Sequence, residues 1–262
     1  MPTIYISDPE WQETFPHWVA PLQDEWLAGL LLRCDEVNDW GSGKTLTHIR
    51  HSPRKPFIDI WHEKTHQRFV VVPNSLNLDS LAQLLATPTS SLLRTTYSVE
   101  LTHLYNSENL SSRGLLPDPY FPFRVCPACL AQDRLLRRTL ALKHISVCPQ
   151  HQINLVEKCA CGVPLKLFNQ HARPFTCHAC SLDWADLPRY KPHHEVLVRK
   201  QKLLIWYEFF FSNGTPEMLR NALNLALPRR SNSSWEMVEL DLLVPLLVDL
   251  GISPSDFMKV YG

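Results

Sequence analysis

The chain has 262 residues, of which 45% are hydrophobic, and its 26 basic and 26 acidic side chains give a formal net charge of zero. This composition suffices for a buried core, and the balanced charge excludes a global electrostatic field that would attract nucleic acid or a membrane surface. The longest apolar stretch, residues 240–250, is far shorter than the ~20 residues of a membrane span. Because no secretory signal precedes the first helix, we expect a cytoplasmic protein with reduced cysteines and no membrane contact.

Residues 1–23 predict an N-terminal arm. Its three large aromatic side chains, Trp11, Phe15 and Trp18, lie among prolines, and Pro16 prevents a continuous helix. Such a segment either packs on the body of the same chain or binds a partner, where tryptophan often contributes much of the affinity. We expect the second, and we assign these three residues to partner binding.

Residues 24–116 predict a helix-turn-helix-like domain with a β-hairpin. Apolar residues recur at helical spacing between residues 27 and 37, after Asp24, which we expect to cap that helix. Two strand-like runs follow, at residues 57–61 and 68–72. Two more helical patterns, at residues 78–85 and 90–96, are separated by a turn at Thr87-Pro88. This outline is typical of DNA-binding helix-turn-helix units, and equally of purely structural helical hairpins.

Residues 117–190 contain seven of the eight cysteines, which together with His151 form four closely spaced pairs. In a reducing compartment such pairs indicate metal ligands rather than disulfides. Two complete tetrahedral Zn²⁺ sites are therefore predicted, both structural, because a catalytic zinc keeps one position open for water. The ligands of the first site are Cys126, Cys129, Cys148 and His151, and those of the second are Cys159, Cys161, Cys177 and Cys180.

The spacing identifies the ligand pairs more firmly than it shows which two pairs share one metal ion. Sequential pairing closes the shorter loops and costs less entropy, so it is favoured over a cross-braced arrangement, which the spacing does not exclude. The spacing of one residue between Cys159 and Cys161 requires the conformational freedom of Gly162. The remaining cysteine, Cys34, is expected to be a buried small hydrophobic residue on a helix face.

A group of basic residues lies inside the first zinc loop. Arg134, Arg137, Arg138 and Lys143 are predicted to share a helix and to contact the phosphates of nucleic acid. The alternative is a solvated helix face that also offsets the negative charge of the two metal sites.

Residues 191–262 predict a C-terminal helical domain. A long helix is expected over residues 195–211, followed by helices that begin at Thr215-Pro216, Ser234 and Ser253-Pro254. The expected fold is thus mainly α with small β elements: an arm at 1–23, a helix-turn-helix-like domain at 24–116, a central double zinc-ribbon or knuckle region at 117–190, and helices at 191–262.

Two short motifs match catalytic or nucleotide-binding patterns without the context that those patterns need. The sequence from His62 to His66 has the H-E-x-x-H form of zinc peptidases, but it lies between strand-like runs instead of on a helix. The run from Gly41 to Thr45 resembles the end of a phosphate-binding loop, but Asn38 replaces the required first glycine. We therefore expect a binding protein and no enzyme.

Two stretches resemble the TniQ family of transposition target-selection proteins. The first is the run of a proline, an acidic pair and an apolar helix from Pro21 to Arg33. The second is the ordered set Cys126-Pro-Ala-Cys129-Leu, Cys148-Pro-Gln-His151, Leu155, Cys159 and Cys161-Gly162. The resemblance covers about residues 15–185, and the single-residue spacing in Cys159-Ala-Cys161 departs from the two-residue knuckle of the family.

The resemblance implies an adaptor of a prokaryotic transposon. Such proteins connect a target-recognising module, for example an RNA-guided CRISPR effector of the Cascade type with its guide RNA, to an AAA+ ATPase regulator (TnsC-like) at target DNA. A second copy of the chain, in a homodimer, is a further expected partner. The alternative is a TnsD-like protein that itself reads a DNA sequence. The predicted recognition helix holds one basic residue, Arg94, which favours the adaptor.

Overall fold

The computed structural model describes residues 17, 19–49, 69, 72, 76–105, 122–169, 171–226 and 240–261. Within these ranges the chain is mainly helical, and its extended segments pair only through isolated β-bridges. Trp11, Phe15 and Trp18, the H-E-x-x-H segment, most of both strand-like runs and Ser234 lie outside the described residues.

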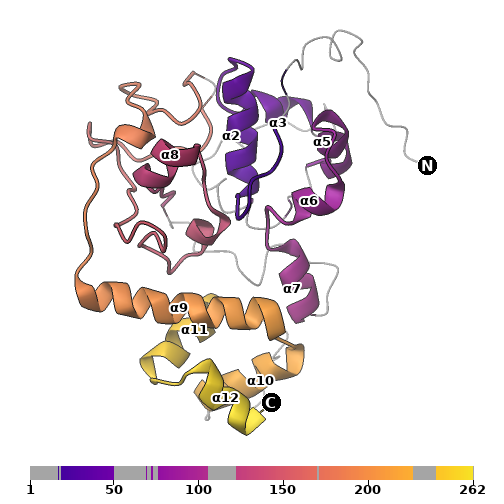
Figure 1. Ribbon diagram of the computed structural model, residues 1–262, viewed down its shortest axis with the longest axis vertical. Helices are drawn as coiled ribbons and strands as arrows, with labels where there is room; N and C mark the ends of the chain where they lie inside the picture. The colour runs from indigo at the N-terminus through magenta and orange to yellow at the C-terminus, as the bar shows by residue number, and fades with distance from the viewer. Residues whose placement is uncertain are drawn as a thin grey trace.

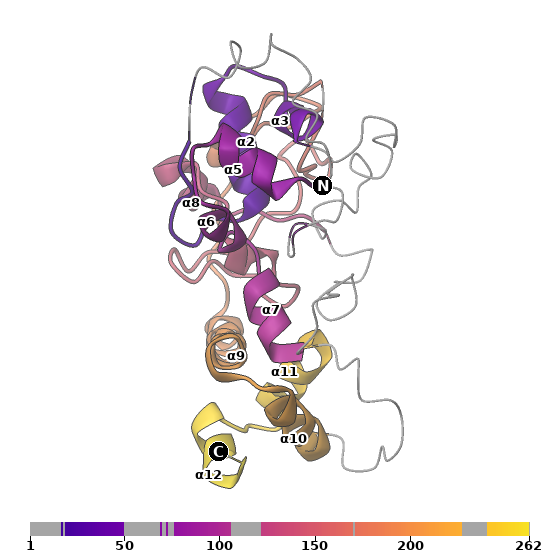
Figure 2. The same ribbon diagram turned by 90° about the vertical axis from the view of Figure 1, so that its right-hand side faces the viewer.

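The described helices form two bodies that are stacked along the long axis of the molecule (Figure 1, Figure 2). The upper body holds α2 (Leu27–Val37), α3 (Lys44–His48), α5 (Leu78–Leu84), α6 (Thr89–Leu93), the metal-binding segments and α8 (Pro127–Asp133). The lower body holds α9 (His194–Asn213), α10 (Pro216–Ala226), α11 (Leu240–Asp249) and α12 (Pro254–Tyr261). Helix α7 (Ser98–Tyr105) lies between the two bodies.

Helix α2 is the centre of the upper body, and eight of its eleven residues are buried. The apolar spacing predicted this helix, but the predicted cap is wrong. Trp26 is the N-cap residue, and Asp24 has a left-handed backbone (φ 57°) that turns its carboxylate away from the helix and toward Arg137 and Arg138. Cys34 is fully buried, as predicted, and burial raises the pKa of its thiol.

Helices α5 and α6 have the predicted outline of helix, short turn and helix. Asn77 caps α5 by accepting a hydrogen bond from the Ser80 N–H at 3.0 Å, and Leu81 and Leu92 are fully buried. The Leu27 N–H donates to the carbonyl of Thr95 at 2.9 Å, so the end of this unit is bonded to the beginning of α2.

The segment from Gly41 to Thr45 binds a carboxylate of the same chain. Asp35 is fully buried and accepts hydrogen bonds from the Gly43 N–H at 2.6 Å and from the Thr45 N–H and hydroxyl, both at 2.7 Å. These three donors are therefore occupied by Asp35 and are not free to bind a phosphate. Burial raises the pKa of Asp35 to about 6, although these hydrogen bonds oppose the shift.

The lower body is built on α9, whose buried face carries Leu203, Trp206, Tyr207 and Phe210. Two of the predicted helix starts are confirmed by their caps. The Thr215 hydroxyl accepts from the Met218 N–H at 3.2 Å, and the Ser253 hydroxyl accepts from the Asp256 N–H at 3.2 Å.

Two hydrophobic cores each join segments that were predicted to belong to different domains. One core joins α2, α5 and α6 to the second cysteine segment, including Phe175, Cys177 and Trp184. The other joins the first cysteine segment, including Cys126, Cys129 and Cys148, to α7 and the helices of the lower body. Helix α8 contributes to both cores, because Leu130 packs in the first and Cys129 in the second.

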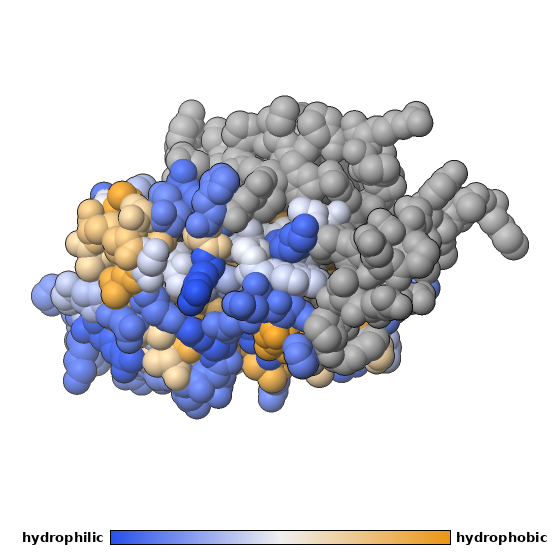
Figure 3. Space-filling model, turned by 90° about the horizontal axis from the view of Figure 1, so that it is seen from above, coloured by the Kyte–Doolittle hydropathy of each residue, from blue (hydrophilic) through white to orange (hydrophobic). Residues whose placement is uncertain are grey.

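The described surface at the upper end of the molecule is mostly hydrophilic, with small, separate apolar patches (Figure 3). Among the described residues, no helix has both the length and the apolar character that crossing a membrane requires.

Candidate metal centres and the arginine cluster between them

The first cluster is assembled from the start of α8 and a tight turn. Cys126 is the N-cap residue of α8 and Pro127 follows it, so Cys129 returns to the same side one turn later. Cys148 and His151 lie in a turn closed by hydrogen bonds of Cys148 to Ile153 and of Gln152 to Cys148, both at 2.8 Å. The three cysteines are buried, and His151 is half-buried.

The second cluster is assembled from two such turns. The Gly162 N–H donates to the carbonyl of Cys159 at 2.9 Å, and the φ of +90° at Gly162 confirms that this turn uses the freedom of glycine. In the other turn the Cys177 N–H donates to the carbonyl of Leu182 at 2.8 Å. Cys159 and Cys177 are buried, whereas Cys161 and Cys180 are exposed, so this cluster opens to solvent.

The predicted ligands form two groups, and in each group the four ligand atoms lie within 4.8 Å of one another. The grouping is sequential and not cross-braced: the first contains Cys126, Cys129, Cys148 and His151, and the second contains Cys159, Cys161, Cys177 and Cys180. No other group of three or more His, Cys, Asp or Glu side chains with this proximity is found among the described residues.

The separations within each cluster fit a tetrahedral Zn²⁺ ion. Bond lengths of ~2.3 Å to sulfur and ~2.0 Å to nitrogen require about 3.8 Å between two sulfurs and about 3.5 Å between sulfur and nitrogen. The Cys129 and Cys148 sulfurs are 3.6 Å apart, and the His151 Nδ1 lies 3.3–3.6 Å from the three sulfurs. In the second cluster the Cys159–Cys180 and Cys161–Cys177 separations are 3.5 and 3.7 Å.

The other nitrogen of His151 supports the same interpretation. With Nδ1 on a metal, Nε2 carries the proton, and it lies 3.3 Å from the side-chain oxygen of Gln132. A hydrogen bond from the second ring nitrogen of a ligand histidine fixes the ring and is usual in zinc sites. The residues therefore fit a metal ion at this position.

Crowding of the sulfurs strongly perturbs their acidity. Hydrogen bonds from the Cys126 and Cys129 thiols lower the pKa of Cys148, whereas the contacts of Cys129 with Cys126 and Cys148 raise the pKa of Cys129. Without a metal, protons must therefore be shared among the sulfurs of the first cluster. A dication replaces these protons and stabilises all three thiolates at once.

The predicted basic residues do not share a helix. Arg134 follows the last residue of α8 with a left-handed backbone (φ 53°), and Arg137 precedes a 3₁₀ turn at Arg138–Ala141. Three of the four side chains form ion pairs with acidic residues of distant segments. Lys143 has no ion pair with a described residue, and its carbonyl accepts a hydrogen bond from Arg124 at 3.0 Å.

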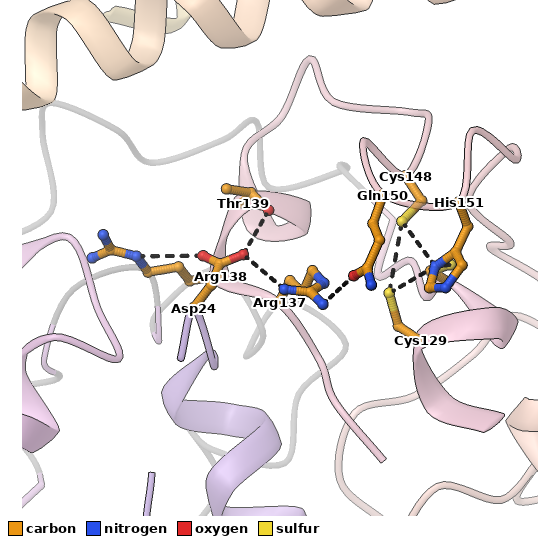
Figure 4. A network of polar contacts seen from close by, with 9 residues as sticks. Asp24, Cys129, Arg137, Arg138, Thr139, Cys148, Gln150 and His151 are labelled. Carbon is orange, nitrogen blue, oxygen red and sulfur yellow. Dashed lines mark hydrogen bonds and ion pairs between the residues drawn. The ribbon is translucent and has the colours of Figure 1, made fainter. Parts of the chain in front are cut away.

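Arg137 lies between the first metal cluster and the start of α2 (Figure 4). Its guanidinium pairs with Asp24 at 3.6 Å and donates a short hydrogen bond to Gln150, which lies between the ligands Cys148 and His151 in the chain. Burial raises the pKa of Asp24, and the charges of Arg138 and Arg137 partly offset this shift. The backbones of the two segments are also bonded to each other, because Glu25 and Arg137 form an antiparallel β-bridge.

Arg138 connects the same segment to α7. Its guanidinium donates to the Thr96 carbonyl at 2.8 Å and to Glu100 at 2.6 Å, and lies 4.7 Å from the centre of the Tyr97 ring. Gly29 of α2 is packed against the same segment, since a Cβ atom at Gly29 would lie 2.8 Å from the Cβ atom of Leu136. Residues 134–139 thus contact both metal segments, α2 and α7, a role that spacing and composition did not indicate.

The sequence model of the TniQ family matches residues 16–155, which is more than half of the chain. The chain belongs to the TniQ family. Membership implies a role in selecting the target of a transposon, as the resemblance predicted. The match includes all four residues of the first cluster and ends before Cys159, so the second cluster and helices α9–α12 lie outside it. Comparison of the sequence with curated proteins found no match.

Proposed function

We propose that the chain is a transposition adaptor that connects an RNA-guided CRISPR effector at target DNA to an AAA+ ATPase regulator (TnsC-like). Family membership supports a role in target selection. The observation that favours an adaptor over a sequence-reading protein is the composition of α6, the second helix of the helix-turn-helix unit. Its five residues include no basic side chain, and Arg94 follows as the C-cap. A helix that reads DNA needs several contacts to phosphates and base edges.

We further propose that both clusters hold Zn²⁺ and act structurally, so that the chain works by binding and not by catalysis. The support is the donor set: thiolates and one imidazole suit zinc, and four protein ligands occupy all positions of a tetrahedral ion. When bound, each Zn²⁺ supplies a fixed crosslink between two turns that have little regular structure of their own. This holds the arginine segment in place between α2 and the lower body.

The adaptor proposal is tested with purified components. Full-length protein should bind the ATPase and the effector–guide complex separately, and should retain both when the three are mixed and separated by size. Substitution of Trp11 and Trp18 by alanine should weaken ATPase binding by about 2 kcal/mol, the usual cost of removing central interface tryptophans. The control is effector binding by the same variant, which should be unchanged. Binding to neither component contradicts the adaptor role.

The alternative, direct reading of a DNA sequence, is favoured by the α5–α6 outline itself. It predicts that the protein alone protects a defined duplex sequence, and that Arg94→Ala weakens this binding. The adaptor proposal predicts equal, weak affinity for duplexes of different sequence.

A further inference from the structure

The segment that joins the second metal cluster to α9 carries positive charge and an aromatic ring on an exposed backbone. Residues 188–193 have no regular secondary structure, and Pro188 and Pro192 oppose a helix here, because proline has no N–H to donate and the residue before it avoids the helical conformation. In Figure 1 this segment runs down one side of the molecule to the beginning of α9. The Tyr190 carbonyl accepts a hydrogen bond from the Asn154 N–H at 2.7 Å, which fixes the backbone against the first metal segment.

Tyr190 is the most exposed aromatic side chain of the described residues, with 61% of its surface accessible. The residues on either side of it, Arg189 and Lys191, are also exposed. By contrast, Tyr97 and Tyr207, elsewhere in the molecule, are buried in a core. Here the ring is presented to solvent between two cations.

These cations have no acidic partner among the described residues, unlike five arginines elsewhere in the chain. Arg33, Arg134, Arg137, Arg138 and Arg199 each pair with a carboxylate. Arg189, Lys191 and Lys202 form no ion pair with a described residue, and all three are exposed. Positive charge continues onto the first turns of α9, where Lys200 donates to the carbonyl of His144 at 2.5 Å.

The local charge balance is strongly positive although the chain as a whole is neutral. The acids nearest in sequence are Asp186 and Glu195. Between residues 189 and 202 the five cationic side chains are Arg189, Lys191, Arg199, Lys200 and Lys202, and the one acidic side chain is Glu195. His193 and His194 add further hydrogen-bond donors. The positive charge of residues 189–202 is thus not cancelled within the segment.

We propose that residues 189–202 form a binding surface for single-stranded nucleic acid, in which Tyr190 stacks on an unpaired base and Arg189, Lys191 and Lys202 contact phosphates. Single strands are bound by this combination, because every base offers a π-face and the backbone offers regularly spaced negative charge. The surface lies outside residues 16–155, so it is not part of the region that defines the family. It goes beyond the adaptor role, which requires no contact with nucleic acid.

The surface is tested with the full-length protein alone, so the result is independent of the adaptor proposal. Fluorescence anisotropy at low salt is measured with labelled 20-nucleotide single-stranded RNA, single-stranded DNA and duplex DNA. Both single strands should bind more tightly than the duplex, since bases in a duplex are not free to stack on Tyr190. The two single-stranded arms identify which nucleic acid is preferred.

Substitutions separate stacking from charge. Tyr190→Ala should weaken single-strand binding about tenfold, whereas Tyr190→Phe, which keeps the ring, should have little effect. The double variant Arg189→Gln with Lys191→Gln should bind with a weaker salt dependence. The magnitude of the negative slope of log K, the association constant, against log salt concentration should fall by about 1.4, at about 0.7 for each phosphate contact. The matched control pair, Arg173→Gln and Arg220→Gln, removes two exposed cations elsewhere and should leave the slope near its original value.

Circular dichroism and the melting temperature establish that each variant is folded. The proposal is overturned by any of three results: equal affinity for duplex and single strands, unchanged affinity in the folded Tyr190→Ala variant, or an equal change of slope in the control pair.

Discussion

Arg134 and Asp183 join the two metal-binding segments through a bidentate ion pair, with the Nη1–Oδ1 and Nη2–Oδ2 separations at 2.7 and 2.5 Å. Arg134 follows α8, which contains the ligand Cys129 and is preceded by the ligand Cys126, and Asp183 follows the last ligand of the second cluster by three residues. Burial raises the pKa of Asp183, but the hydrogen bonds and the charge of Arg134, together with a hydrogen bond from the Ala185 N–H, hold that pKa below its ordinary value. The pair therefore fixes the orientation of one metal segment relative to the other.

Removing this pair should loosen the contact between the two segments without releasing metal. We expect Arg134→Ala and Asp183→Ala each to lower the free energy of unfolding by about 1–2 kcal/mol, because both side chains are only about two-thirds buried. In a double-mutant cycle the coupling should be about 1 kcal/mol. Urea denaturation of the four proteins measures it, and additive single effects would show that the two side chains do not interact in solution.

Metal analysis of the purified protein should give two zinc ions per chain. The exposed sulfurs of Cys161 and Cys180 make the second cluster more accessible than the first. A chelator in excess should therefore remove one zinc quickly and the other slowly, which a colorimetric zinc indicator can follow. Simultaneous release of both ions would be inconsistent with the difference in burial.

Loss of each metal should also affect a different part of the molecule. Cys177 packs in the core of α2, α5 and α6, and Cys126 in the core of α7 and the lower body. Hydrogen exchange should therefore increase mainly in α2 and α5 for Cys177→Ser, and mainly in α9 and α11 for Cys126→Ser. If both variants are insoluble, the stepwise chelation described above provides the same comparison in the unsubstituted protein.

The arginine cluster should contribute to stability more than to nucleic-acid binding. Arg138 contacts Thr96, Glu100, Tyr97 and Asp24, so Arg138→Ala should lower the free energy of unfolding by about 2–3 kcal/mol. Lys143→Ala should change it by less than about 0.5 kcal/mol.

The nucleic-acid role predicted for Arg134, Arg137, Arg138 and Lys143 is tested by the salt dependence of binding to an effector–DNA complex. Each lost phosphate contact reduces the magnitude of the slope of log K against log salt concentration by about one. From the ion pairs of the three arginines, we expect such a change only for Lys143→Ala. A change of about one at each arginine would mean that the ion pairs open when nucleic acid binds.

Asp35 should make the protein less stable as the pH rises. Its pKa is raised to about 6 in the folded protein from an ordinary value of 3.8, so between these values the folded chain binds more protons than the unfolded chain. The free energy of unfolding therefore falls with rising pH in this window, by at most about 3 kcal/mol from this group. Relative to Asp35→Asn, the unsubstituted protein should lose stability between pH 4 and pH 7. Urea denaturation at each pH gives the free energy of unfolding of both proteins, and the difference between them cancels the effect of acid on the metal sites. A difference that does not change with pH would contradict the expectation.

Local pattern predicted the helices and the ligand groups well. Apolar residues at helical spacing placed α2 and α5 within a few residues, the long helix expected at residues 195–211 is α9, and Thr215 and Ser253 cap helices as expected. The cysteine spacing identified both clusters because a metal site is built from short turns whose geometry depends on a few adjacent residues.

The contacts of the arginine segment could not be predicted in this way. Asp183 lies 49 residues from Arg134, and Thr96 lies 42 residues from Arg138. No periodicity relates such positions, since their proximity depends on how the finished cores are packed. Asp24 illustrates the consequence: it has the residue type and position of a helix cap, but two arginines from a distant segment hold its carboxylate instead.

The core around the first cluster limits how this chain can be recombined with its relatives. Leu140, Ile145 and Ile153, all from within the family-matched region, pack together with Trp206, Phe210 and Leu243 from beyond it. A chimera joined near residue 155 or 190 would bring a foreign apolar surface against these side chains and would leave cavities or steric clashes beside the metal. The helices after residue 193 therefore cannot be exchanged alone for those of a relative. A functional chimera must also take from that relative the residues of the family-matched region that pack against α9.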